Sequence, residues 1–269
     1  GQILVAQDDG TLKIWDVSSR QYSRTLTTGA RDFRWVRFSP NGRWIAAIAD
    51  WGYFRWTCRA WDSATGREVS LPGDAFRQVT VAEFLSQTDL LAVVSGERTA
   101  RVMNLKSQTV VQDLHDAPDS VLSIAADPLA RTLAIGADNH QVTLSKLVNG
   151  LPAAAASAQD PQQITLPGRQ PTALRYSPDG QSLLIGTSTG PLYESDGDPA
   201  HEPRVLNIES HSPINSIAFN PAQTHLLLAT GRGKLQLSEW EPQESRTAAR
   251  TAARGAHRQA LLVGPADGL

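Results

Sequence analysis

A hydrophobic run that ends in a proline-containing turn occurs five times along the chain, at nearly constant intervals. From Pro128 onward, the turn prolines are 50, 43 and 44 residues apart, and Pro40 precedes Pro128 by 88 residues, which is twice 44. A similar run without proline, 84–87, fills the long gap. Such a constant interval indicates an array of one repeated structural unit. The five turns occupy residues 38–42, 126–128, 176–180, 219–221 and 264–268.

Each repeat contains short runs that are typical of β-strands. Near the start, an apolar run at 3–6 and an alternating run at 11–16 flank Asp8-Asp9-Gly10, and Asp-Gly in that position favours a hairpin. Short strands in units of about 40–45 residues favour the blades of a β-propeller. Further strands are expected at 32–39, 43–50, 55–62, 67–71, 78–85, 89–95, 100–104, 108–114, 120–126, 132–137, 141–146, within 151–166, at 172–177, 182–187, 191–195, 204–208, 214–220, 225–230, 234–240, and before 255.

The repeats resemble those of the WD-repeat family. In that family a first strand ends in a turn such as Ser-Pro-Asp-Gly, and a third strand ends in Trp-Asp. Trp15-Asp16 and Trp61-Asp62 match the second feature fully, whereas Trp240 is followed by Glu241. The resemblance covers most of the chain. It implies an all-β fold, a WD-repeat β-propeller with four antiparallel strands in each blade.

The repeat boundaries predict one domain, 1–269, with six blades. The last fifteen residues read as the opening strand of a repeat, and residues 1–28 supply the other three strands. We therefore expect the two ends to share one composite closing blade, made of 1–28 and 255–269. If the chain is cut from a longer array, seven blades are the alternative. The contiguous blades are 29–72, 73–115, 116–167, 168–209 and 210–254.

The resemblance also implies a buried network in some blades, which links a histidine, a hydroxyl side chain, a turn aspartate and the tryptophan. Buried polar groups of this kind need hydrogen-bond partners, so their role is structural rather than chemical. A catalytic or metal-binding role for the histidines is the less favoured alternative. The residues expected at such structural positions are His257, Asp9, Trp15, His115, Asp138, Trp61, Asp62 and Trp240.

Composition and motifs exclude several classes of function. The net charge of −2 creates no field that would favour nucleic acid or an anionic membrane. The single cysteine, Cys58, excludes an internal disulfide and fits a reducing compartment, so we expect a cytoplasmic location. No His-Glu-x-x-His, Gly-x-Ser-x-Gly or Cys-x-x-Cys motif is present. We therefore predict no enzyme activity, no metal, no cofactor, and no nucleic-acid or membrane partner.

Aromatic residues cluster in one expected turn. Trp51 and Tyr53 lie between the second and third strands of a blade, beside Arg55, and exposed aromatics next to arginine are typical of protein-binding hot spots. The alternative is that these rings fold back over a neighbouring blade. We predict a protein-binding face built from such turns and from the entries to first strands. Its residues are Arg31, Trp51, Tyr53, Arg55, Glu97, Arg98, Asn139, His140, Arg169, Arg232 and Lys234.

Residues 246–258 carry arginines every four positions in an alanine-rich run, a pattern that suits a short basic helix as well as a solvated outer strand. For the whole chain, the sequence favours a non-catalytic protein–protein interaction scaffold with an unidentified partner. The alternative is a sensor or ligand-recognition domain of a larger signalling protein that carries an NTPase, kinase or protease. A propeller enzyme with a channel site is a third, less favoured reading.

Overall fold

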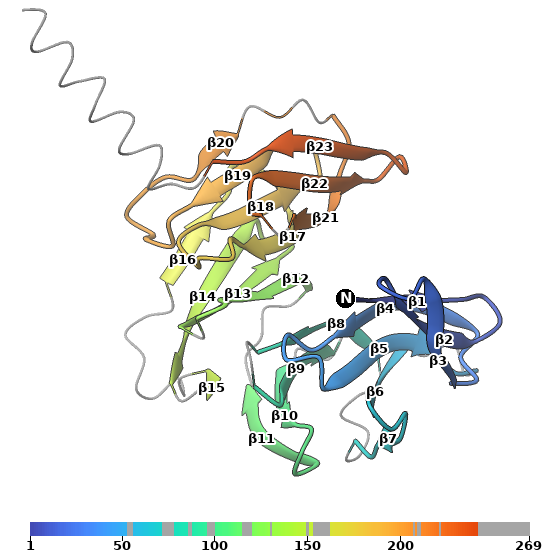
Figure 1. Cartoon of the computed structure of the whole chain (residues 1–269). Coiled ribbons are helices and arrows are strands. Elements are labelled where there is room, and N and C mark those ends of the chain that lie inside the picture. Colours follow the sequence, from blue (N-terminus) through green and yellow to red (C-terminus); the bar gives the residue numbers. More distant parts are fainter. Residues whose placement is uncertain are drawn as a thin grey trace, which may run out of the picture.

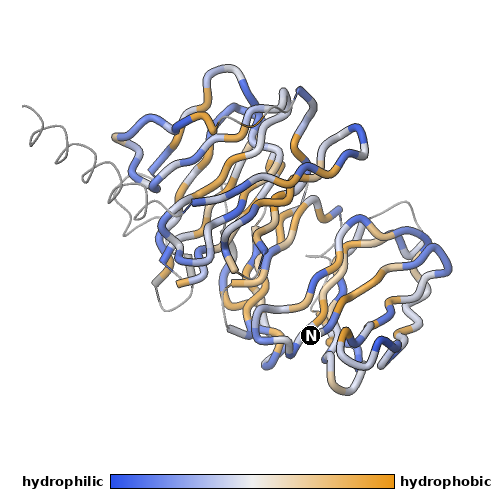
Figure 2. Tube along the Cα trace, turned by 45° about the horizontal axis from the view of Figure 1, so that its top comes forward, coloured by the Kyte–Doolittle hydropathy of each residue, from blue (hydrophilic) through white to orange (hydrophobic). Residues whose placement is uncertain are grey.

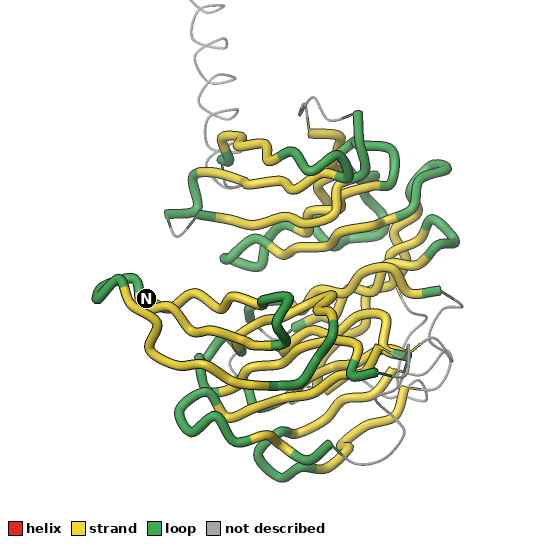
Figure 3. Tube along the Cα trace, turned by 90° about the vertical axis from the view of Figure 1, so that its right-hand side faces the viewer, coloured by secondary structure: helices red, strands yellow, loops and turns green. Residues whose placement is uncertain are grey.

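The chain forms six antiparallel sheets that follow one another as the blades of a β-propeller, as Figures 1 and 3 show. This computed structural model describes residues 1–52, 56–71, 78–85, 88–95, 100–114, 120–129, 131–148, 151–152, 162–206, 208, 211–220 and 222–241. The described residues form only strands and their connections. The predicted all-β propeller with six blades is thereby confirmed.

The first three sheets come from the N-terminal part of the chain. The first sheet holds β1 (Gln2–Ala6), β2 (Thr11–Asp16) and β3 (Gln21–Thr27). The second holds β4 (Asp32–Phe38), β5 (Trp44–Asp50), β6 (Trp56–Asp62) and β7 (Glu68–Val69). The third holds β8 (Val79–Phe84), β9 (Leu90–Ser95), β10 (Ala100–Asn104) and β11 (Thr109–Leu114).

The remaining sheets continue in chain order. The fourth holds β12 (Val121–Ala126), β13 (Thr132–Ala137), β14 (Gln141–Val148), β15 (Leu151–Pro152) and β16 (Gln162–Thr165). The fifth holds β17 (Pro171–Tyr176), β18 (Leu183–Thr187), β19 (Leu192–Ser195) and β20 (Arg204–Leu206). The sixth holds β21 (Ile214–Phe219), β22 (His225–Thr230) and β23 (Leu235–Glu239).

The opening strand expected for the first sheet and the outer strand expected for the sixth sheet fall outside the described residues. Each of these sheets has three described strands. The composite closing blade of 1–28 and 255–269 therefore stays a prediction, as does the strand or helix at 246–258. In the fourth sheet, where one outer strand was expected within 151–166, two short strands pair with β14: β16 along residues 141–144 and β15 at its far end.

The repeated turn that marks the sequence has a simple physical basis. In the second sheet, the Ser39 hydroxyl accepts a hydrogen bond from the Trp44 amide at 2.9 Å, and the Gly42 amide donates to the Ser39 carbonyl. Ser177 and Gly180 form the same contacts in the fifth sheet. Gly42 and Gly180 have φ values of 70° and 69°, a left-handed conformation that glycine adopts without steric penalty.

The hydrophobic core is divided among the five interfaces between consecutive sheets. The middle strand β5 shows how this works. Ala46 and Ile48 face the third sheet, while Ile45 and Ala47 face the first sheet. A middle strand covered on both sides is apolar throughout rather than alternating, and Figure 2 shows hydrophobic segments along the strands with hydrophilic turns between them.

Each of the five inner strands carries a β-bulge at its second or third residue. The bulged residues, which interrupt the pairing with the next strand, are Arg34, Thr80, Leu122, Thr172 and Asn215. A bulge bends its strand and re-aims a side chain. All five bulged residues line one cavity at the centre of the propeller.

Candidate functional site

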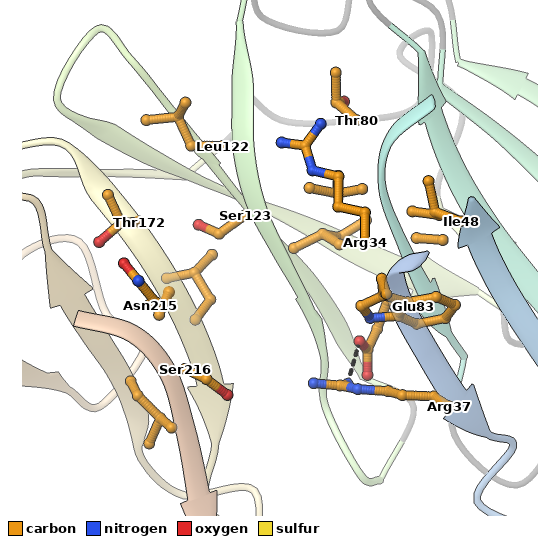
Figure 4. A pocket seen from close by; sticks show the side chains of 17 residues that line it. Arg34, Arg37, Ile48, Thr80, Glu83, Leu122, Ser123, Thr172, Asn215 and Ser216 are labelled. Carbon is orange, nitrogen blue, oxygen red and sulfur yellow. Dashed lines mark hydrogen bonds and ion pairs between the residues drawn. The ribbon is translucent and has the colours of Figure 1, made fainter. Parts of the chain in front are cut away.

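The central cavity is lined mainly by the inner strands β4, β8, β12, β17 and β21 and has a volume of about 200 Å³. Figure 4 shows that its lining side chains come from both sides of the ring. Three residues beyond the bulges, a second set of inner-strand positions carries Arg37, Glu83 and Arg175. At about 3.3 Å per residue, this set lies about 10 Å further along the strands than the bulged set.

Charge is concentrated on one part of this channel. Arg37 donates a hydrogen bond to Glu83 through an Nη1–Oε2 contact of 2.6 Å, drawn as a dashed line in Figure 4. Burial raises the pKa of Glu83, and the positive charges of Arg37 and Arg175 oppose that rise. Burial also lowers the pKa of Arg175, and the positive charge of Arg37 acts in the same direction. Two guanidinium groups and one carboxylate therefore share this part of the channel.

These channel residues were not predicted from the sequence. The signal was present as Arg34, Arg37, Glu83 and Arg175, which are charged positions inside otherwise apolar inner strands. Their convergence depends on the ring arrangement of the sheets and on the register of the bulges, neither of which is encoded in one strand alone.

The second candidate site is the face formed by the turns between second and third strands and by the connections that enter the inner strands. In an up-and-down sheet, alternate turns lie at opposite ends, so these two groups of loops share one end of each sheet. We call this end the loop face. Its described turns include 8–10, 138–140, 188–190 and 231–233.

Main-chain hydrogen bonds join the entering connection to the turn in successive sheets. The Arg31 amide donates to the Asp50 carbonyl at 2.7 Å in the second sheet. In the next three sheets for which both residues are described, the bond runs the other way. The turn amides of Asp138, Ser188 and Gly231 donate to the carbonyls of Ser120, Gln170 and Pro213 in the entering connections. Each bond fixes the entering connection to the turn of the same sheet.

The predicted aromatic turn is partly anchored. The Trp51 indole is half-buried, packs at the interface of the first two sheets, and donates through Nε1 to the Thr28 carbonyl at 3.2 Å. The Arg59 guanidinium lies 4.5 Å from the centre of the Trp51 ring. Tyr53 and Arg55, its predicted neighbours, lie outside the described residues, as do Glu97 and Arg98.

The other predicted loop-face residues vary in exposure. Arg31, Asn139, Arg232 and Lys234 are exposed, and the Arg31 guanidinium lies beside Gly52. Arg169 is half-buried and donates a hydrogen bond to the Tyr193 hydroxyl, over whose ring its guanidinium lies. These residues share the loop face through their positions in its turns and connections.

His140 is also half-buried, and its backbone has a φ of 66°. Among the described residues, the buried Nδ1 atom of its ring has no hydrogen-bond partner. The His140 carbonyl, by contrast, accepts a hydrogen bond from the Leu166 amide at 2.8 Å. This position is therefore held through its backbone rather than through its imidazole.

The residues predicted to be structural occupy different environments. Trp61 and Trp240 are buried in the core, and the Trp240 ring meets Phe219 edge to face. Trp15 packs edge to face against Tyr22. Asp9 is exposed and accepts hydrogen bonds from Thr11 within its own turn.

Asp62 makes similar local bonds with Thr65, and these bonds lower its pKa. Asp138 is half-buried, and its amide forms the bond to Ser120 described above. His115 and His257 lie outside the described residues. Any network through these two histidines therefore stays a prediction.

Two kinds of feature are absent from the described part of the chain. It contains no group of three or more histidine, cysteine or acidic side chains placed to hold a metal ion. Within the same residues, no helix has the length and apolar character needed to cross a membrane.

Comparison with known proteins shows a limited similarity. No protein-family model matches the chain. The chain is similar to Actin-interacting protein 1 of Drosophila melanogaster. The two sequences are 24% identical over 279 residues, which cover 97% of this chain but 40% of the fly protein. The chain thus spans well under half the length of this relative, and the similarity fits a protein-interaction role in general terms.

Proposed function

We propose that the propeller is a non-catalytic scaffold that binds a partner protein on its loop face. The observation that carries the proposal is the repeated main-chain bond between entering connection and turn, seen at Arg31, Asp138, Ser188 and Gly231. A loop that is already fixed loses little conformational entropy when a partner binds, so more of the contact energy appears as affinity. Binding sites are often carried by loops on a rigid scaffold.

The name of the fly relative suggests the first partner to test. That protein is named for an interaction with actin. We propose actin, or a protein of the same filament system, as the partner of this chain. Co-sedimentation of the purified chain with filamentous actin is the direct test, and the chain is expected in the pellet. A chain that stays in the supernatant at all actin concentrations rules out filamentous actin as the partner.

The binding face is tested with two matched triple variants. One replaces the exposed loop-face cations Arg31, Arg232 and Lys234 by alanine. The other replaces Arg20, Arg67 and Lys106, which are exposed in turns at the opposite end of the sheets. Both variants lose two arginines and one lysine, so they change net charge equally.

We expect a partner captured by the wild-type chain from its native host to be lost by the first variant and kept by the second. Equal circular dichroism spectra and unfolding midpoints would establish that both variants are folded. Loss of the partner in the second variant alone would overturn the assignment of the loop face. Loss in both would indicate that binding depends on total charge and not on one face.

A further inference from the structure

The central channel carries more positive than negative charge. Among its described lining residues, the charged ones are Arg34, Arg37 and Glu83. Arg175 follows the lining residue Leu174 on β17 and is close enough to Arg37 and Glu83 for their charges to act on it. Three guanidinium groups therefore accompany one carboxylate, and the carboxylate is already bound to Arg37.

Arg175 is the residue that this arrangement leaves unexplained. Its side chain is half-buried, yet in the described part of the structure it makes neither a hydrogen bond nor an ion pair. A guanidinium taken partly out of water is costly unless it is paired, and it offers five N–H donors in a planar fork. Arg34 likewise makes no hydrogen bond there, and its guanidinium lies 5.9 Å from the centre of the Trp56 ring.

We propose that the channel binds a small oxyanion, a carboxylate or phosphate group, between Arg175 and Arg37, with Arg34 drawing it into the cavity. Arginine forks bind carboxylates and phosphates through paired N–H···O bonds that are shorter and stronger than neutral ones. The bound group completes the pairing of Arg175 and leaves the Arg37–Glu83 bond in place. Both ligand classes present the same oxygen acceptors.

The size of the cavity favours a small group. Its volume of about 200 Å³ is below the range of about 300–1,000 Å³ that holds drug-sized ligands. The hydroxyls of Thr80, Ser123 and Thr172 already donate to backbone carbonyls. Asn215 and Ser216, which also line the cavity, add neutral donors beside the charged donors of the arginines. The site thus favours an anion over a neutral polar group because of its excess positive charge, and not for lack of neutral donors. It needs no partner protein and is independent of the proposed loop-face binding.

Anion binding is tested by isothermal titration calorimetry at constant ionic strength. The probes are inorganic phosphate, succinate and a hexaglutamate peptide, which distinguish a free phosphate, a free carboxylate and an acidic side chain. We expect saturable binding of at least one probe, with one site per chain. Arg175→Gln is expected to weaken that binding at least tenfold. Arg67→Ala, which removes an exposed arginine at the end of the sheets opposite the loop face, is expected to leave it unchanged.

Glu83→Gln provides a second, independent variant. It removes the carboxylate that competes for Arg37 while keeping the shape of the side chain. We expect it to bind the same probe several-fold more tightly, so the proposal remains testable even if Arg175→Gln does not fold. Absence of binding by all three probes overturns the proposal. Binding that is equal in wild type, Arg175→Gln and Glu83→Gln overturns it as well.

Discussion

His140 lies at a turn position that glycine occupies in other sheets. Gly10, Gly190 and Gly233 hold the third place of their three-residue turns, with φ values of 79°, 111° and 68°. His140 holds the same place between β13 and β14 with a φ of 66°. A three-residue hairpin loop commonly ends in a left-handed residue, and a side chain there is strained.

Replacing His140 by glycine is therefore expected to keep or raise stability, by up to about 1 kcal/mol. His140→Val is expected to lower stability by about 1–2 kcal/mol, because a branched side chain tolerates positive φ poorly. Urea unfolding of both variants measures the difference. If glycine destabilises the protein as much as valine does, the imidazole itself has a stabilising role.

Cys58 allows a chemical test of the packing between the second and third sheets. Its thiol is buried between the second and third sheets, and burial raises its pKa to about 12. Because the thiolate is the reactive form, we expect no reaction of the folded protein with a thiol reagent at pH 8. Full reaction is expected in urea. Rapid labelling under native conditions would contradict the packing of this interface.

The contact between the exposed His201 and Asp196 is expected to depend on pH. His201 Nδ1 lies 2.7 Å from Asp196 Oδ2, and the hydrogen bond and negative charge of Asp196 raise the pKa of His201. The contribution of this pair to folding stability is fully present below the pKa of His201 in the unfolded chain. It is lost as pH rises through the higher pKa of the folded state. An NMR titration should show that Asp196→Asn lowers the pKa of His201, and an unchanged value would exclude the pair in solution.

At the scale of the strand, close packing between blades depends on small residues in the middle strands. A Cβ atom added to Gly186 on β18 would lie 2.6 Å from Ile214 Cγ2 on the inner strand of the next sheet. Gly136 on β13 has a similar relation to Pro171, with a closest approach of 2.9 Å. These glycines are required by packing rather than by backbone conformation.

Gly186→Ala is therefore expected to destabilise the protein by about 1–3 kcal/mol through overpacking. Gly231→Ala is the matched control, since the added Cβ would meet Pro213 at an ordinary distance of 3.4 Å. We expect that control to change stability by less than about 0.5 kcal/mol. Chemical unfolding measures both, and equal effects would contradict the close approach of β18 and β21.

Most of the strands could be predicted from sequence, because alternation and turn residues are local signals. The runs at 132–137 and 225–230, for example, match β13 and β22 in full. The bulges could not be predicted in this way, since a bulge is a relation between two strands. The convergence of the channel arginines depends on those bulges and on the ring arrangement of the sheets, so it was not predicted. The positions of the turn residues Arg31 and Arg232 on the loop face, by contrast, follow from strand order alone.

At the scale of the whole molecule, the sixth sheet differs from the sheets that have a neighbour on both sides. Leu226 and Leu228 pack against the fifth sheet, whereas Leu235 and Leu237 on the opposite face of the sheet are 70% and 67% exposed. In the described part of the chain, the first and sixth sheets lie at the two ends of the series, without the extensive contact seen between consecutive sheets. An apolar face of this kind is normally covered.

We predict that the closed ring covers this face in solution. Leu237→Ser should then lower stability by about 1.5–3 kcal/mol, because burial of a leucine side chain contributes about that much. Val205→Ser on the outer strand β20, where the side chain is 56% exposed, serves as the control and should have a much smaller effect. Equal small effects in thermal and urea unfolding would show that the face stays open.

The most direct test of the scaffold account is hydrogen–deuterium exchange of the chain with and without its captured partner. The account predicts that the partner slows exchange in the loop-face turns 8–10, 138–140, 188–190 and 231–233. Exchange in the opposite turns at 39–42, 177–180 and 222–224 should stay unchanged. Protection confined to those opposite turns, or to the outer strands β7, β11 and β20, would contradict the account and place the binding surface elsewhere.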